Sequence, residues 1–241
     1  MAQELFVEIN GFKLFAKLCG ENKGKPAVIM EAGYGDTSTT WDPILHEISN
    51  RTEVLVYDRA GVGKSEKSPN SRTSKDMVSE LNLLIKKLEL KRPFIFVGHS
   101  FGGVNVRLFA SQYPDKVCGL ILVDSTPADY VERFLPTMSE DFQKAYKNQF
   151  FYEGDFEEMM ISLNQLKENK RVLSVPLTVL SAGNKAHYSK ASQKLWNDMQ
   201  KDIVNISSNS EIIVAEKSSH YIHHDEPEVV IRAINRIIDQ A

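Results

Sequence analysis

Five short apolar runs are the feature of this 241-residue sequence that most limits its fold. They are almost free of polar residues and cover 27–30, 54–57, 94–97, 120–123 and 177–180. Unbroken apolarity indicates strands buried on both faces, which is typical of parallel sheets covered by helices. Residues 212–214 (Ile-Ile-Val) supply a sixth candidate strand.

The segments around these runs predict the remaining elements. Residues 2–20 alternate apolar and polar positions around Gly11, which indicates an antiparallel hairpin. Residues 74–90 carry apolar side chains at helical spacing. Asp225, with Pro227 and Glu228 after it, has the pattern of an acidic cap that opens a last helix. Strands that alternate with helices predict an α/β fold.

Residues 126–172 interrupt the alternation, because they contain no convincing strand. They are too long for a plain connection. They also hold eight of the 22 aromatic residues of the chain. We expect a helical lid or cap, 126–172, inserted into a core formed by 1–125 and 173–241.

Composition and charge exclude several classes of protein. Hydrophobic residues make up 42% of the chain and charged residues 25%, with a net charge of −3, so a nucleic-acid partner is not expected. Two cysteines form no disulfide framework or metal motif. The first residues lack the basic and apolar regions of a signal peptide, and no apolar run is long enough to span a membrane. We expect a cytoplasmic protein without membrane association; the oligomeric state stays open.

The sequence Gly98-His99-Ser100-Phe101-Gly102 carries the clearest chemical signal. It matches G-x-S-x-G and stands between a buried strand and a helical pattern. Such a strand-to-helix turn exposes the serine hydroxyl, and its glycines allow close backbone packing. The helix N-terminus behind the serine favours a developing oxyanion. Ser100 is therefore the candidate nucleophile.

Several further motifs occur in a familiar order around this turn. They are 30–35 (Met-Glu-Ala-Gly-Tyr-Gly), 57–65 (Tyr-Asp-Arg-Ala-Gly-Val-Gly-Lys-Ser), 122–125 (Leu-Val-Asp-Ser) and 219–221 (Ser-His-Tyr). Together they make nearly the whole chain similar to the α/β-hydrolase superfamily. The resemblance implies a mostly parallel, eight-stranded sheet flanked by helices, with a helical lid. Its motifs are specific for the fold and much less so for the substrate.

A serine hydroxyl needs a base to react at neutral pH. The superfamily carries serine, acid and histidine in that chain order. His220 follows the last candidate strand, where similar proteins carry the base, and it is our candidate. His223 and His224 are interpreted as structural or surface residues.

The acid is the less obvious member. In many relatives it follows the strand after the insertion, but here that position holds Asn184, and a neutral amide cannot stabilise an imidazolium as a carboxylate does. Some relatives place the acid after the preceding strand, where this chain has Asp124. Asp124 is therefore our choice. Asp225 is a further candidate, although its capping role would explain it.

The oxyanion donors are expected to be the backbone N–H groups of Tyr34 and Phe101. The Tyr34 side chain could also line the pocket. Residues 61–65 (Gly-Val-Gly-Lys-Ser) look like part of a phosphate loop, but Asp58 stands where that motif needs glycine. We interpret them as a structural turn.

These residues predict a serine hydrolase for small-to-medium hydrophobic esters, acting through Ser100, His220, Asp124 and an acyl-enzyme. No metal and no organic cofactor are expected. The partner is a small-molecule substrate, and residues 126–172 are suspected to bind it. Two alternatives stay open. The same triad could cleave a C–C bond, a lactone or a peptide N-terminus, or act as a cofactor-free peroxidase; the fold could also serve as a ligand receptor.

Overall fold

The computed structural model of the protein describes residues 2–241, so Met1, the first residue of the expected core 1–125, lies outside the described residues. The strands are β1 (Ala2–Ile9), β2 (Phe12–Cys19), β3 (Ala27–Glu31), β4 (Val54–Tyr57), β5 (Phe94–His99), β6 (Val117–Val123), β7 (Leu173–Ala182) and β8 (Ser207–Ala215). The helices are α1 (Asp42–Ser49), α2 (Ser74–Lys87), α3 (Gly102–Gln112), α4 (Glu140–Asn148), α5 (Phe156–Glu168), α6 (Lys190–Ile203), α7 (Ile222–Asp225) and α8 (Pro227–Gln240).

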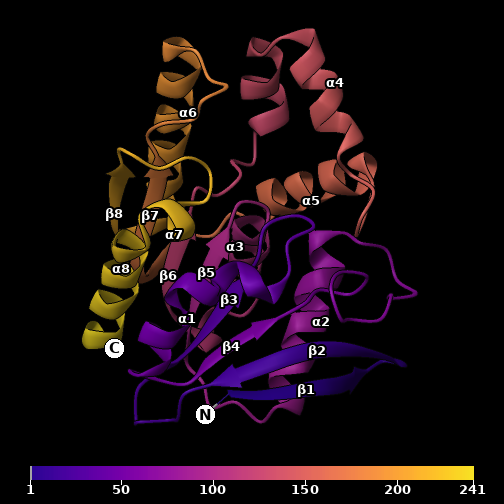
Figure 1. The fold of residues 1–241 in the computed structure, drawn as a ribbon, viewed down its shortest axis with the longest axis vertical. Helices are drawn as coiled ribbons and strands as arrows, with labels where there is room; N and C mark the ends of the chain where they lie inside the picture. Colours follow the sequence, from indigo (N-terminus) through magenta and orange to yellow (C-terminus); the bar gives the residue numbers. More distant parts are fainter. Residues whose placement is uncertain (1) are drawn as a thin grey trace.

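All eight strands form one sheet in the order β1-β2-β4-β3-β5-β6-β7-β8. The hairpin of β1 and β2 is antiparallel and joins β4 at one edge, while β3 to β8 are parallel (Figure 1). The predicted mostly parallel, eight-stranded α/β fold is confirmed. The carboxyl ends of β3, β5, β6, β7 and β8 meet at one edge of the sheet, which is where ligands bind in open α/β sheets.

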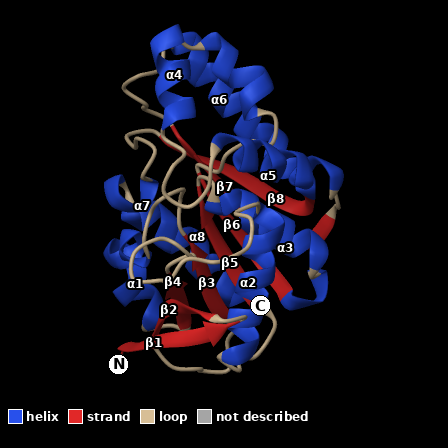
Figure 2. Cartoon of the chain, turned by 90° about the vertical axis from the view of Figure 1, so that its right-hand side faces the viewer, coloured by secondary structure: helices blue, strands red, loops and turns tan. Residues whose placement is uncertain are grey.

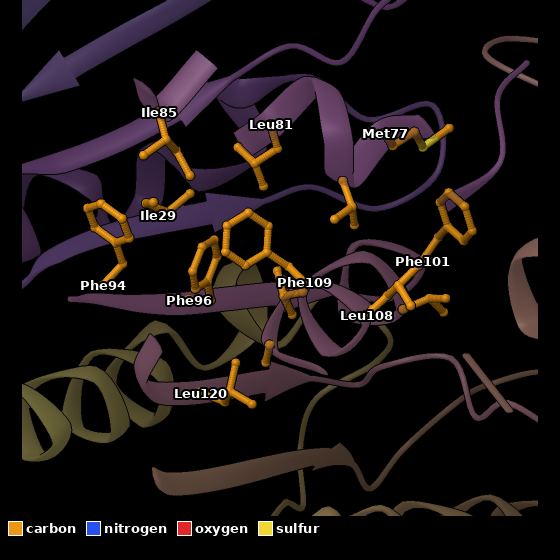
Figure 3. Packing of buried hydrophobic residues seen from close by; sticks show 14 of the residues in the cluster. Ile29, Met77, Leu81, Ile85, Phe94, Phe96, Phe101, Leu108, Phe109 and Leu120 are labelled. Atoms are coloured by element: carbon orange, nitrogen blue, oxygen red, sulfur yellow. The ribbon is translucent and has the colours of Figure 1, made fainter. Parts of the chain in front are cut away.

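Helices cover both faces of the sheet. Side chains along a strand alternate between its faces, so Phe94 and Phe96 enter the core beneath α2 and α3, and Ile95 and Val97 enter the core beneath α1 and α8. Figure 3 shows the first of these cores, where Phe96 and Phe109 lie together below α2. This two-sided burial is the reason why the central strands contain almost no polar residues.

Residues 126–172 contain no strand within the described chain. They hold α4, α5, a π-helical turn (Tyr130–Phe134) and a 3₁₀ turn (Leu135–Thr137). α5 packs on α2 and α3, and the π-helical turn contacts α6. α4 and α6 lie at the top of the molecule in both views (Figures 1 and 2). The function of this segment as a lid stays a prediction.

The C-terminal helix begins differently from the prediction. Asp225 closes the short helix α7, because its N–H donates to the Tyr221 carbonyl oxygen. The chain then turns at Glu226, and α8 starts at Pro227 without a side-chain cap. The Asp225 carboxylate instead accepts hydrogen bonds from the N–H and hydroxyl of Ser219, at 2.8 and 2.6 Å. The capping role expected for Asp225 is therefore wrong.

Crossing a membrane requires a helix that is both long and apolar. No helix within residues 2–241 meets both conditions.

Candidate active site

Ser100 occupies the sharp turn between β5 and α3. Its φ angle of 51° lies in the left-handed region, which is uncommon for a residue with a side chain. A side chain at Gly98 would meet Val106 and Gly103, and one at Gly102 would meet the carbonyl oxygens of Glu31 and Ala32. The two flanking glycines therefore allow the strand and the helix to approach closely enough to hold this turn.

His220 lies in the loop between β8 and α7, beside the end of β6. Its Nδ1 atom is 2.6 Å from Oδ2 of Asp124, although 96 residues separate the two in sequence. The Asp124 side chain is fully buried, and 36% of the His220 side chain is exposed. The structure therefore brings the expected base and the expected acid into one hydrogen-bonded pair, and both Ser100 and His220 line one cavity.

The Asp124 carboxylate accepts four donors. Its Oδ1 atom accepts the N–H of Ala182 at 2.9 Å and the indole N–H of Trp196 at 2.7 Å. Its Oδ2 atom accepts His220 and also the ammonium of Lys185, at 2.5 Å. Burial alone would raise the pKa of Asp124, but the Lys185 charge and the His220 hydrogen bond hold it well below its usual range. The group is a carboxylate at any ordinary pH.

The two alternative acid positions have other surroundings. Asn184 is exposed, and its N–H donates to the Ser218 carbonyl oxygen at 3.0 Å. Asp225 contacts Ser219, the residue before His220, and so braces the loop that carries the imidazole.

The neighbouring histidines lie beneath this loop. His99 is fully buried, and its Nε2 atom is 3.0 Å from the carbonyl oxygen of His220, to which it can only donate. His223 is also fully buried. Its ring is tilted against that of Trp41, with ring centres 4.5 Å apart, and its Nε2 atom lies 3.0 Å from the Thr40 hydroxyl. Nε2 of His224 lies 2.8 Å from the Thr40 carbonyl oxygen. These contacts support the loop rather than the reacting end of the site.

The two expected oxyanion donors line the same cavity as Ser100. Arg59 orients the peptide that carries the Tyr34 N–H. Its guanidinium donates to the carbonyl oxygens of Ala32 (2.7 Å) and Gly33 (2.5 Å). The C=O and N–H of a trans peptide point in opposite directions. The contact with the Gly33 carbonyl therefore turns the Tyr34 N–H away from Arg59. Phe101 immediately precedes α3, where helix N–H groups lack intrahelical partners.

The insertion is tied to this loop through a buried ion pair. Glu153 accepts two hydrogen bonds from Arg59, at 2.6 and 2.7 Å, and a third from the N–H of Gly35 at 2.8 Å. Glu31 contacts the other side of the guanidinium at 3.1 Å. The Tyr34 hydroxyl also reaches the insertion, donating to the Gly154 carbonyl oxygen at 2.6 Å. Residues 153 and 154 thus hold the loop that carries the Tyr34 amide.

The cavity above Ser100 has a volume of about 470 Å³, within the range of small-molecule sites. Its walls are rich in aromatic side chains, and the insertion provides several of them. The lining residues from the insertion are Thr126, Tyr130, Phe142, Tyr146, Gln149, Phe150 and Met159. The exposed Phe151 and Tyr152 do not line it. Ser100 and His220 thus share one cavity, in which the imidazole is paired with a buried carboxylate.

Sequence reasoning did not identify three participants in this arrangement: Lys185, Arg59 and Glu153. Lys185 directly follows Asn184 in a polar loop, and nothing local distinguishes it from a surface lysine. Arg59 belongs to a motif that we interpreted only as a structural turn. Glu153 is one of many charged residues in the insertion, and nothing local marks it as the buried one.

Comparisons with known proteins show the family of the chain. The family described as alpha/beta hydrolase fold matches residues 26–210. The uncharacterized protein YqjL of Bacillus subtilis (strain 168) is 37% identical over 209 residues, covering 86% of this chain and 81% of YqjL. Among solved structures, a thermophilic esterase from Thermogutta terrifontis (TM-score 0.69, 20% identity) covers 99% of this chain and 98% of its own. The epoxide hydrolase CorEH (TM-score 0.67, 17% identity) covers 100% and 99%. The chain belongs to the α/β-hydrolase family.

Proposed function

We propose that this protein hydrolyses carboxylic ester-like bonds of small-to-medium hydrophobic substrates, with Ser100 as nucleophile, His220 as base and Asp124 as acid. The observation that carries the proposal is the 2.6 Å contact between His220 Nδ1 and Asp124 Oδ2, in a cavity that His220 shares with Ser100, whose turn has a positive φ. The esterase among the structural neighbours is consistent with it.

The reaction follows from these positions. Asp124 holds the proton of His220 on Nδ1, which leaves Nε2 free to take the Ser100 proton as the hydroxyl oxygen attacks the carbonyl carbon. The amides of Tyr34 and Phe101 stabilise the resulting oxyanion. The imidazolium then gives its proton to the leaving alcohol. Water, activated by His220, hydrolyses the acyl-enzyme and releases the acid.

The cavity walls support an apolar acyl or alcohol group. The Tyr34 ring forms edge contacts with Phe101 and Phe150, with ring centres 6.1 and 4.8 Å apart, and all three residues line the cavity. Aromatic walls bind hydrophobic groups by burying area, and a few polar groups orient them.

The test is labelling with a fluorophosphonate, followed by mapping of the modified peptide. We expect the label on Ser100 and turnover of p-nitrophenyl esters that varies with acyl length. S100A should abolish both, whereas S208A, the same change at an exposed serine of β8, should abolish neither. A label on another residue, or esterase activity retained in S100A, would refute the proposal. Lactones, aminoacyl amides and C–C substrates tested beside the esters would reveal the alternative reactions, and tight binding without turnover would favour a receptor.

A further inference from the structure

We propose that Lys185 is a positioning residue that places a positive charge on the same Asp124 oxygen that holds His220, and thereby keeps His220 unprotonated in acidic solution. This inference rests on the proposed triad. It assigns a function to the loop after β7. Many relatives carry the acid of the triad in this loop, whereas this chain has no Asp or Glu there.

The geometry brings the Lys185 ammonium and the His220 imidazole to the same carboxylate oxygen of Asp124. Oδ2 of Asp124 lies 2.5 Å from Lys185 Nζ and 2.6 Å from His220 Nδ1. Since the carboxylate is fully buried and only 8% of the Lys185 side chain is exposed, water screens the three charges poorly. Lys185 lines the cavity together with Ser100, so its charge belongs to the reacting site.

Two aromatic rings hold the ammonium in this place. Lys185 Nζ lies 3.3 Å from the ring centre of Trp196 and 5.1 Å from that of Tyr188. Both distances are within the range of cation–π attraction. Trp196 also donates its indole N–H to Oδ1 of Asp124. The lysine and the carboxylate therefore contact the same indole, which favours the ammonium in this position.

The charge acts on His220 by repulsion. A like charge beside an imidazole disfavours its protonated form, while the Asp124 carboxylate favours it. Burial and the Lys185 charge together outweigh Asp124 and lower the pKa of His220. Asp124, Lys185, His99 and Tyr221 are the titratable groups that lie around the His220 imidazole. Behind them, His223 contacts His99, and Asp36 contacts Tyr221 and His99.

Lys185 carries its charge in the pH range where this matters. Burial lowers the pKa of Lys185 to about 8, so the ammonium is protonated throughout the acidic range in which His220 could be titrated. Without Lys185, the imidazole would face an uncompensated carboxylate and bind a proton at higher pH. An enzyme with a protonated His220 has no base for Ser100.

The experiment measures the rate constant of fluorophosphonate labelling of Ser100 from about pH 4 to 9. K185Q removes the charge but keeps a hydrogen-bond donor for Asp124, and K185M removes both and keeps the packing on Trp196. We expect the acid limb of each variant to move to higher pH by about one unit. K185R, which retains the charge, should keep the wild-type midpoint. K194Q, the same change at an exposed lysine of α6, should also keep it.

The outcomes separate this inference from the proposed function. Absence of label on Ser100 in the wild type refutes the triad itself. Labelling of Ser100 with the wild-type midpoint in both K185Q and K185M refutes the inference about Lys185 alone, even if these variants react more slowly or unfold more easily. If either variant fails to fold, the other decides. A titration of ¹⁵N-labelled histidine by NMR, with H220Q to assign the signal, must give the same direction of shift.

Discussion

The substitution D124N tests the proposed acid most sharply, because the four hydrogen bonds of Asp124 dictate what an amide must do there. Oδ1 accepts two donors that cannot change, the N–H of Ala182 and the indole N–H of Trp196. The amide oxygen of Asn must therefore stay with them. The new NH₂ group then replaces Oδ2 and faces His220 and Lys185, which are both donors in the native site.

The imidazole can relieve this conflict by moving its proton. If Nδ1 of His220 accepts from the new amide, the proton resides on Nε2, and that atom can no longer take the proton of Ser100. A triad histidine in the wrong tautomer costs about 10⁴ in kcat. At about 1.36 kcal/mol per factor of ten, the loss of transition-state stabilisation is about 5.4 kcal/mol. Lys185 also loses its buried carboxylate, so we expect unfolding to become easier by about 3 kcal/mol.

The assay is kcat for a p-nitrophenyl ester, measured well below the unfolding temperature of the variant, with circular dichroism to show that the fold is retained. D42N, the same change at an exposed aspartate of α1, is the matched control and should keep the wild-type kcat. A folded D124N that retains kcat within a factor of ten would refute both the acid and the tautomer argument.

Three further predictions concern neighbouring groups. E153Q places an amide against the Arg59 guanidinium and should destabilise the fold by about 3 kcal/mol in urea unfolding, with a larger effect on kcat than on KM, because Arg59 orients the Tyr34 amide; unchanged stability would contradict the buried pair. N184A should leave kcat unchanged, since Asn184 is exposed outside the cavity, and a loss of kcat comparable with that of D124N would reassign the acid. Burial keeps the pKa of His223 well below its ordinary value. Below pH 6.5 the unfolded chain therefore binds a proton on His223 that the folded chain does not bind. His223 thus lowers the free energy of unfolding by about 1.4 kcal/mol for each unit by which the pH decreases. Because the lowered pKa of His220 gives a slope of the same sign, urea unfolding of H223N should show a slope that is smaller by about 1.4 kcal/mol per pH unit; an equal slope in both proteins would exclude a contribution from His223.

Local sequence was sufficient for the fold and for the turn that carries Ser100. The predicted runs at 54–57 and 94–97 lie in β4 and β5, because a strand buried on both faces must be apolar along its length, whatever its neighbours are. The Ser100 turn was equally predictable, since its constraint is local: only glycine fits at 98 and 102, where the strand and the helix approach each other. The helix expected over 74–90 ends at Lys87, because Glu89 adopts a positive φ of 53°.

Tertiary structure decided which distant side chains meet at the carboxyl edge of the sheet. Because β6 lies between β5 and β7, Asp124 faces both the loop of Ser100 and Lys185, and His220 reaches it across 96 residues of sequence. Glu153 of the insertion likewise contacts Arg59, in the loop after β4, across 94 residues of sequence. No local pattern encodes these contacts, since a surface lysine and a buried one look alike in sequence, and Asp225 carries a capping pattern that it does not use. Periodicity records which face of an element is buried, whereas the partner of a buried charge depends on strand order, and only the folded sheet determines that.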